Sequence, residues 1–98
     1  MMRFRSKKLE REYRQRRSLV EQILEERPIC QRCHAARSTD VHEVIRRSQW
    51  QAGFLVSDNL RALCRQCHTW VTEHPRAAVE EGWSAWSWQR NEYGGQDA

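Results

Sequence analysis

The sequence predicts a small α+β domain that is stabilised by something other than a large apolar core. Leu, Ile, Val and Phe supply only 17 of the 98 residues, 31 % of the residues are charged and the mean hydropathy is −0.95. A chain this short and this poor in aliphatic residues needs disulfides, a metal ion or a partner to fold stably. Helical periodicity near the N-terminus and a β-branched stretch in the middle predict both kinds of element. Two matched pairs of cysteines are candidates for the missing stabiliser.

The first predicted element is a helix from Lys7 to Arg27, a stretch that contains neither Gly nor Pro. Its apolar residues fall roughly on one helical stripe: Leu9, Tyr13, Val20, Ile23 and Leu24. Pro28 ends this helix because the residue before a proline is pushed out of the helical region. A tight turn is expected over 29–34, and the β-branched residues of 39–45 predict a strand.

The second half of the chain predicts a loop, a short strand and two helices. Residues 46–59 favour the loop, 61–63 the strand and 64–73 the first helix. Pro75 fits the start of the second helix and Gly82 its end. The stretch 83–88 is rich in tryptophan and ambiguous, and the polar, Gly-rich residues 91–98 predict a frayed end. We therefore expect a basic helical arm (1–27), a central domain (28–82) and a Trp-rich extension with its tail (83–98).

The positive charge is concentrated in two parts of the chain. Residues 1–17 carry a net charge of +6 and residues 27–76 a net charge of +4. A basic arm and a basic centre suit a polyanion, and nucleic acid is the expected partner. The alternative for the arm is an ordinary solvated helix face. Neither a membrane-spanning run nor a secretory signal is visible, so we expect a cytoplasmic location and no membrane partner.

The cysteines occur as Cys30-x-x-Cys33 and Cys64-x-x-Cys67. Two such pairs can supply the four thiolates of a closed, tetrahedral structural zinc site, and a reducing compartment favours metal over disulfides. The zinc would contribute folding free energy on the order of 10 kcal/mol. Each pair is followed by His, which also makes it a c-type haem attachment motif. We disfavour haem because its attachment takes place outside the cytoplasm and the chain lacks the apolar surface to enclose two haems.

Between and after the cysteine pairs lie two histidines that could form a second site. His42 falls on the predicted strand, His68 on the first turn of the following helix, and Asn59 on the loop between them. Two imidazoles can hold a divalent ion that keeps positions open for water and a phosphate oxygen, as hydrolysis requires. A lone histidine is more commonly an ordinary surface or core residue, so the prediction depends on the combination.

Three sequence pieces together resemble the HNH endonucleases. They are Cys30-x-x-Cys33, then Val41-His42-Glu43-Val44-Ile45-x-Arg47-Ser48, then Asn59-Leu60-x-x-Leu63-Cys64-x-x-Cys67-His68. The resemblance covers about residues 28–82, and its continuation from Trp70 to Pro75 is similar to small phage and prophage members. It implies a zinc-stapled ββα-metal (HNH) finger of the α+β class, with an added N-terminal helix and a C-terminal helix.

The resemblance also implies roles for individual residues. His42 corresponds to a ligand of the catalytic ion, and Glu43 to the general base that is commonly a histidine. A carboxylate that titrates well below neutral pH is a weak base. An alternative alignment with the family motif therefore makes His42 the base and leaves the ion to His68 and Asp40. Asn59 matches the asparagine that positions the base-bearing loop, and His68 matches the last metal ligand. His74 is either an additional ligand or phosphate contact, or a solvated side chain.

The implied activity is metal-dependent nicking of double-stranded DNA by a phage- or prophage-type endonuclease. The alternative is a zinc-stapled DNA-binding or DNA-packaging accessory module with little or no catalysis. The catalytic ion would be Mg²⁺ or another divalent ion such as Mn²⁺ or Ni²⁺. A second copy of the chain and phage packaging proteins are further candidate partners. The candidate DNA-binding residues are Lys7, Lys8, Arg11, Arg14, Arg46, Arg47, Arg61 and Arg65.

The five tryptophans are expected to fill the small core rather than to stack on bases. They are Trp50, Trp70, Trp83, Trp86 and Trp88. Trp86 and Trp88 alternate as on a strand, which makes a partner surface the second interpretation for these two.

Overall fold

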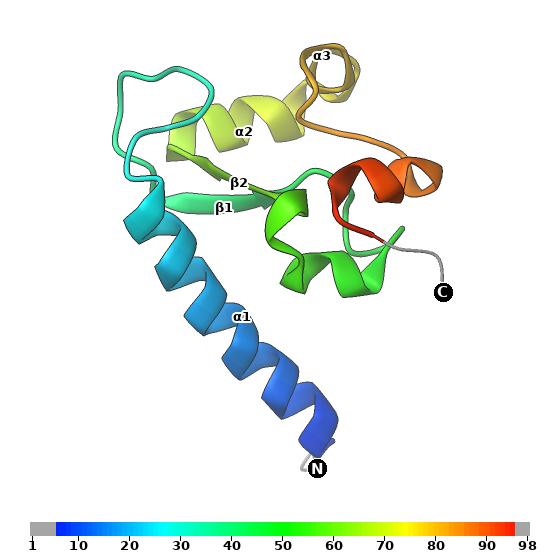
Figure 1. Cartoon of the computed structure of the whole chain (residues 1–98). Coiled ribbons are helices and arrows are strands. Elements are labelled where there is room, and N and C mark those ends of the chain that lie inside the picture. Colours follow the sequence, from blue (N-terminus) through cyan, green and yellow to red (C-terminus); the bar gives the residue numbers. More distant parts are fainter. Residues whose placement is uncertain (1–5, 96–98) are drawn as a thin grey trace, which may run out of the picture.

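The computed structural model describes residues 6–95, and it places a two-stranded antiparallel sheet between helices (Figure 1). The elements in order are α1 (Lys7–Glu26), β1 (Asp40–Glu43), η1 (Gln51–Leu55), η2 (Ser57–Asn59), β2 (Leu60–Leu63), α2 (Arg65–Glu73), α3 (Pro75–Glu81) and η3 (Ser87–Tyr93). The order β1, β2, α2 is that of a ββα finger, with α1 before it and α3 after it. The predicted α+β class is confirmed.

The sheet separates two sets of side chains because successive residues of a strand point to opposite faces. Val41 and Glu43 pair with Ala62 and Leu60, respectively, and these residues form the face toward α1. Asp40 and His42, which pair with Leu63 and Arg61, lie on the other face. Figure 1 shows α1 below the sheet and α2 above it. The alternation therefore directs Asp40 and His42 toward α2.

The helix ends follow ordinary capping chemistry. α1 begins after Ser6, whose hydroxyl accepts a hydrogen bond from the N–H of Leu9 at 3.1 Å. α2 begins after Cys64, whose Sγ accepts from the N–H of Cys67 at 3.4 Å, so the second cysteine pair is also a helix cap. Pro75 is the first residue of α3, and Gly82 ends this helix in the left-handed conformation with φ of 87°. The predicted helix boundaries are confirmed to within a residue.

The core is divided into two small clusters. One surrounds the cysteines, with Leu63, Val71 and Ala78 buried beside them and Trp70 and Trp83 packed at its edge. The other lies under α1 and joins the helix to the sheet through Ile23, Leu60 and Ala62. Neither cluster is large, which agrees with the aliphatic-poor composition.

The C-terminal part of the described chain corrects two predictions. The frayed end predicted from Asn91 is wrong for residues 91–95, because η3 continues to Tyr93 and Gly95 is buried. Residues 96–98 lie outside the described part. Gly94 permits this packing, since a Cβ there would approach Val56 Cγ1 to 2.7 Å. The prediction of a Trp-filled core is wrong for Trp86 and Trp88, which are exposed.

The predicted loop 46–59 is also more ordered than expected, since it contains η1 and η2. Within the described residues, no helix combines the length and apolar character that crossing a bilayer requires.

Candidate metal centre and active site

The two cysteine pairs meet in space. The Sγ atoms of Cys30, Cys33, Cys64 and Cys67 all lie within 4.8 Å of one another, and Cys30, Cys64 and Cys67 are buried. The N–H of Cys33 points at Cys30 Sγ at 3.5 Å, as that of Cys67 does at Cys64 Sγ. Each pair is therefore a turn that presents two sulfurs to the same point.

This cluster fits a tetrahedral zinc ion. Zn–S bonds of ~2.3 Å place tetrahedral sulfurs about 3.8 Å apart, and Cys33 Sγ and Cys64 Sγ are separated by 4.0 Å. The donor set is four thiols with no oxygen ligand, which suits zinc and leaves no position open for a substrate. These residues would hold a structural ion that joins the segment before β1 to the start of α2.

The protonation of the thiols depends on their surroundings. Burial opposes ionisation of Cys30, but the N–H groups of Cys33 and Cys64 outweigh it and lower the pKa of Cys30 to about 6. Burial raises the pKa of Cys67 to about 12, although the guanidinium of Arg32 lies 3.6 Å from its sulfur. Four thiolates in one small volume require a shared cation, which is what zinc supplies.

Arg32 connects the cysteine cluster to α3 and the segment after it. Its guanidinium lies 3.7 Å from the centroid of the Trp70 ring and forms an ion pair with Glu81 at 3.0 Å. Glu81 also accepts a hydrogen bond from Trp83 Nε1 at 2.9 Å. This chain of contacts positions Trp83 beside the sheet.

The second predicted site is formed by His42 of β1 and His68 of α2. Their rings lie edge to face with centroids 5.4 Å apart, and both line one cavity of about 850 Å³. The other walls come from the rest of β1, including Glu43, from the segment after it with Arg46, and from α2, α3 with Arg76, and the segment 84–86 with Trp86. The structure therefore brings together the two imidazoles that the sequence pattern pairs.

Hydrogen bonds fix the tautomers of both rings. His42 Nε2 donates to the carbonyl oxygen of Trp83 at 2.6 Å, which leaves Nδ1 as the acceptor of the neutral ring. His68 Nδ1 lies 2.8 Å from Asp40 Oδ2, and an ionised carboxylate can only accept, so Nε2 of His68 carries the lone pair. Burial lowers the pKa of His42, which keeps this ring neutral.

Asp40 is held in its ionised form. Burial alone would oppose this, but hydrogen bonds from His68 and Thr39 and the charge of Arg65 outweigh it and lower the pKa of Asp40. The Nε atom of Arg65 lies 2.9 Å from Asp40 Oδ2. A carboxylate behind an imidazole is the common support of a metal-binding histidine.

Asn59 closes the loop between the strands. It is fully buried, and its Oδ1 accepts from the N–H of Ile45 at 2.9 Å. Its Nδ2 donates to the carbonyl oxygens of Ile45 and Gly53, each at 3.1 Å. Gly53 makes this possible, because a Cβ there would come within 2.8 Å of Asn59 Nδ2. The amide thus ties both ends of the loop that follows β1.

Glu43 lies on the face of the sheet that α1 covers. Its carboxylate is near Arg16 of α1 at 3.9 Å and Arg47 at 3.5 Å. Arg16 in turn donates to the carbonyl oxygen of Phe54 at 2.8 Å. The neighbouring residues His42 and Glu43 therefore have different surroundings, as strand alternation requires.

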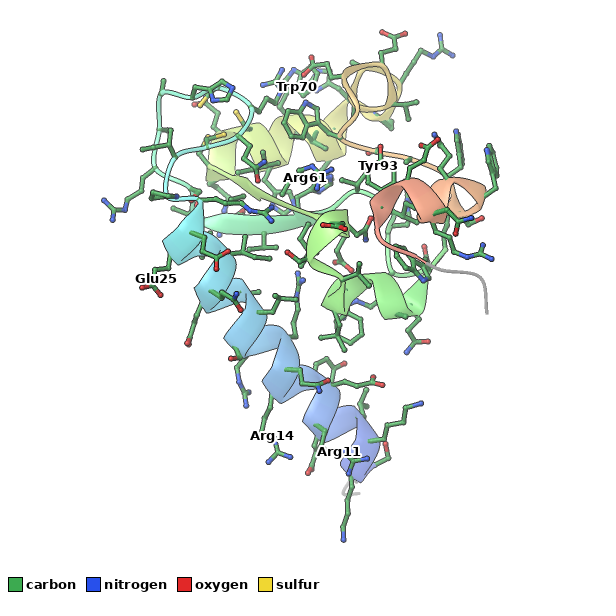
Figure 2. The ribbon with its side chains drawn as sticks, in the orientation of Figure 1. Arg11, Arg14, Glu25, Arg61, Trp70 and Tyr93 are labelled. Atoms are coloured by element: carbon green, nitrogen blue, oxygen red, sulfur yellow. The ribbon has the colours of Figure 1, made fainter. Side chains whose placement is uncertain are left out.

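The candidate DNA-binding cations are distributed over two regions. Lys7, Lys8, Arg11 and Arg14 are exposed on α1, and Figure 2 shows Arg11 and Arg14 pointing away from the body of the molecule. Arg46 is exposed at the cavity, whereas Arg47 and Arg65 are paired with acids. Arg61 belongs to β2, and its guanidinium donates to the carbonyl oxygens of Asp58 and Leu60 at 2.9 and 2.8 Å and lies 5.7 Å from the centroid of the Tyr93 ring of η3 (Figure 2).

Two contributors to this region carry no recognisable sequence signal. The carbonyl of Trp83 leaves no signature, because every residue has one. In the sequence Arg16 is only one more cation of the basic arm, and its contact with Glu43 depends on how α1 packs. His74, in contrast, is exposed, stacks on Trp70 at 4.9 Å and does not line the cavity.

The comparisons with known proteins identify one family. Residues 30–74, just under half of the chain, match the model of the family HNH endonuclease. The match begins at Cys30, the first clustered cysteine, and extends past His68 to His74. Searches of curated proteins and of solved structures found no match.

Proposed function

Residues 30–74 carry an HNH endonuclease domain with the four-cysteine cluster of its zinc-stabilised members, and we propose that this domain nicks DNA by metal-dependent phosphodiester hydrolysis. The observation that carries the proposal is the pair His42 and His68. Two imidazoles with defined tautomers line one cavity on a ββα finger, and each retains a ring nitrogen that makes no described hydrogen bond.

We assign the general base to His42. Its Nδ1 is the acceptor atom, and the carbonyl of Trp83 holds the opposite nitrogen. A neutral imidazole can take a proton from the attacking water near neutral pH. Glu43 is the less suitable base because Arg16 and Arg47 engage its carboxylate on the other face of the sheet. This arrangement supports the alternative assignment from the sequence, in which His42 is the base and His68 binds the ion.

His68 is the proposed ligand of the catalytic divalent ion, through Nε2. Such an ion stabilises the negative charge that develops on the phosphate oxygens and on the leaving oxygen. Asp40 orients the ring and increases its basicity by accepting from Nδ1. Arg46 and Arg76, both exposed at the cavity, would hold the phosphates of the DNA strand.

A nicking assay tests the proposal. Supercoiled plasmid is incubated with the chain and Mg²⁺, Mn²⁺ or Ni²⁺, and His42→Ala and His68→Ala are compared with the unaltered protein. Loss of the base should lower the rate on the order of 10²- to 10⁴-fold. His34→Asn is the matched control, because His34 follows the first cysteine pair as His68 follows the second. Asn also tolerates the left-handed conformation of this residue, whose φ is 56°.

One observation favours a second candidate function, that of a DNA-binding or packaging module without catalysis. Over the part of the chain that the structure describes, the cysteines are the only group of three or more side chains placed to hold a metal ion together. A zinc-stapled DNA-binding or packaging module would need no further ion. Equal plasmid conversion by the unaltered chain, His42→Ala and His68→Ala would contradict the nuclease and favour this module, whatever its origin in a phage or a host.

A further inference from the structure

The exposed apolar side chains of this protein are concentrated beside the cavity. Of the four large hydrophobic residues that are exposed in the described chain, Val79 belongs to α3, Trp86 directly precedes η3 and Trp88 lies in η3. Trp86 is 46 % and Trp88 71 % exposed. Val79 and Trp86 line the same cavity and Trp88 stacks on Trp86, and exposed apolar side chains that gather in this way are candidates for an interaction site.

The two indoles stack on each other, with centroids 5.5 Å apart and planes within 7° of parallel. Their inner faces cover each other, so the outer face of Trp88, the more exposed ring, is the flat platform. Trp86 also lines the cavity that contains His42 and His68. The pair therefore extends one wall of the candidate active site outward into solvent.

Backbone hydrogen bonds attach this platform to the active site. The N–H of Ala85 donates to the carbonyl oxygen of Val44 at 3.1 Å, and the carbonyl of Trp83 accepts from His42. The N–H of Trp86 donates to Gln89 Oε1 at 2.9 Å, which fixes the start of η3. The position of the indoles is thus coupled to the end of β1.

The surroundings of the platform favour a nucleobase as its occupant. Arg46 and Arg76 are exposed at the same cavity and suit phosphates, whereas Glu80 on the rim offsets part of their charge. Flat aromatic groups next to cations are the combination by which proteins hold single strands, because every base has a π-face. In an intact duplex those faces are covered by neighbouring bases.

We infer that Trp88, backed by Trp86, stacks on an unpaired nucleobase next to the phosphate that enters the His42–His68 cavity. The substrate class is then DNA with a single-stranded or unpaired stretch. This inference deepens the proposed function, on which it rests for the position of the phosphate.

The test is a binding measurement without added divalent ion, so that no strand is cut. Fluorescence anisotropy compares a short single strand with the duplex of the same sequence, for the unaltered chain, Trp88→Ala and Trp88→Phe. Trp88→Ala should weaken single-strand binding on the order of tenfold and duplex binding much less. Trp88→Phe, which keeps a ring, should recover most of the loss. Ile29→Ala is the matched control, since Ile29 is exposed at 51 % but lies outside the cavity.

A strand with abasic sites separates stacking from charge. The unaltered chain should bind it about as weakly as Trp88→Ala binds the normal strand. Equal affinity of Trp88→Ala and the unaltered chain, or an equal loss for single strand and duplex, overturns the inference. If the inference fails in this way but the unaltered chain nicks plasmid, the proposed nuclease activity is still supported. If single-strand binding depends on Trp88 but no nicking occurs, the nuclease activity is contradicted and the platform is supported.

Discussion

The carboxylate of Asp40 lies 2.8 Å from Nδ1 of His68, across the gap between β1 and α2. Because the surroundings lower the pKa of Asp40, this carboxylate is ionised at neutral pH and accepts the imidazole proton. In the neutral ring of His68 the proton is therefore on Nδ1, and Nε2 carries the lone pair. One contact between a strand and a helix thus determines which nitrogen can bind a metal ion.

We expect Asp40→Asn to weaken binding of the catalytic ion by about 10- to 100-fold and to slow nicking correspondingly. The substitution keeps the side-chain shape but removes the charge that selects the tautomer. Titration with Mn²⁺ measures the affinity directly, and nitrogen chemical shifts of His68 report the tautomer. Thr39→Val is the control, since Thr39 donates to the other oxygen of Asp40 from an exposed position. Unchanged Mn²⁺ affinity in Asp40→Asn would contradict the assignment.

Removing zinc should unfold the central domain. The apolar clusters are small, and zinc in such sites contributes on the order of 10 kcal/mol. The purified protein is expected to contain stoichiometric zinc by elemental analysis, and a strong chelator should abolish its near-UV circular dichroism until zinc is returned. Zinc should also be released as the pH falls, because protons compete for the thiolates. A reductant without chelator serves as the control, and unfolding by it would indicate disulfides instead.

The sequence is informative where the signal is local. Cysteine spacing predicts the cluster, Pro75 and Gly82 mark α3, and β-branched residues mark β1. Strand alternation alone implies that Asp40 and His42 share a face that Glu43 does not. The face of Asp40 and His42 is turned toward α2 and His68, whereas the carboxylate of Glu43 lies near Arg16 of α1, although Glu43 also lines the cavity.

Contacts made by the backbone or by distant segments cannot be inferred in this way. The carbonyl of Trp83 reaches His42 only because the segment after α3 folds back onto β1. The polar composition of the C-terminus suggests fraying, yet Gly94 packs closely against Val56 and Asp58, and Gly95 against Trp50 and Arg90. For Trp86 and Trp88 the sequence offers exposure only as the second interpretation, because composition does not show which tryptophan rings remain outside the core.

Asn59→Ala should destabilise the fold by about 3 kcal/mol, because the buried amide of Asn59 makes three hydrogen bonds. The N–H and C=O of Ile45 would lose the partner that Asn59 provides, whereas the C=O of Gly53 would still accept from the N–H of Val56 at 3.2 Å. Urea denaturation measures the free energy of unfolding, and nicking should fall in parallel as the loop loosens. Gln49→Ala, an exposed change in the same loop, should alter the stability little. A loss no larger than that of this control would show that the amide does not hold the loop.

The rate of nicking should decline on the acid side with a midpoint below pH 6.5. Burial lowers the pKa of His42 from its ordinary value of 6.5, so the ring stays neutral and able to accept a proton at pH values where a free histidine is already charged. Single-turnover rates measured against pH give the midpoint, and an NMR titration of the His42 ring gives its pKa independently. An acid limb at or above pH 6.5 would be inconsistent with a buried neutral base.

The basic arm should bind DNA through phosphates alone. Lys7, Lys8, Arg11 and Arg14 are exposed on the part of α1 that extends beyond the body of the protein (Figure 1). Replacing these four by Gln should lower duplex affinity equally for all sequences and reduce the slope of log K against log salt by about 0.9 for each phosphate that is no longer neutralised. Arg37→Gln, an exposed change outside α1, is the control. An unchanged slope would mean that the charges of α1 only solvate the helix, and affinity would then have to come from Arg46 and Arg76 at the cavity.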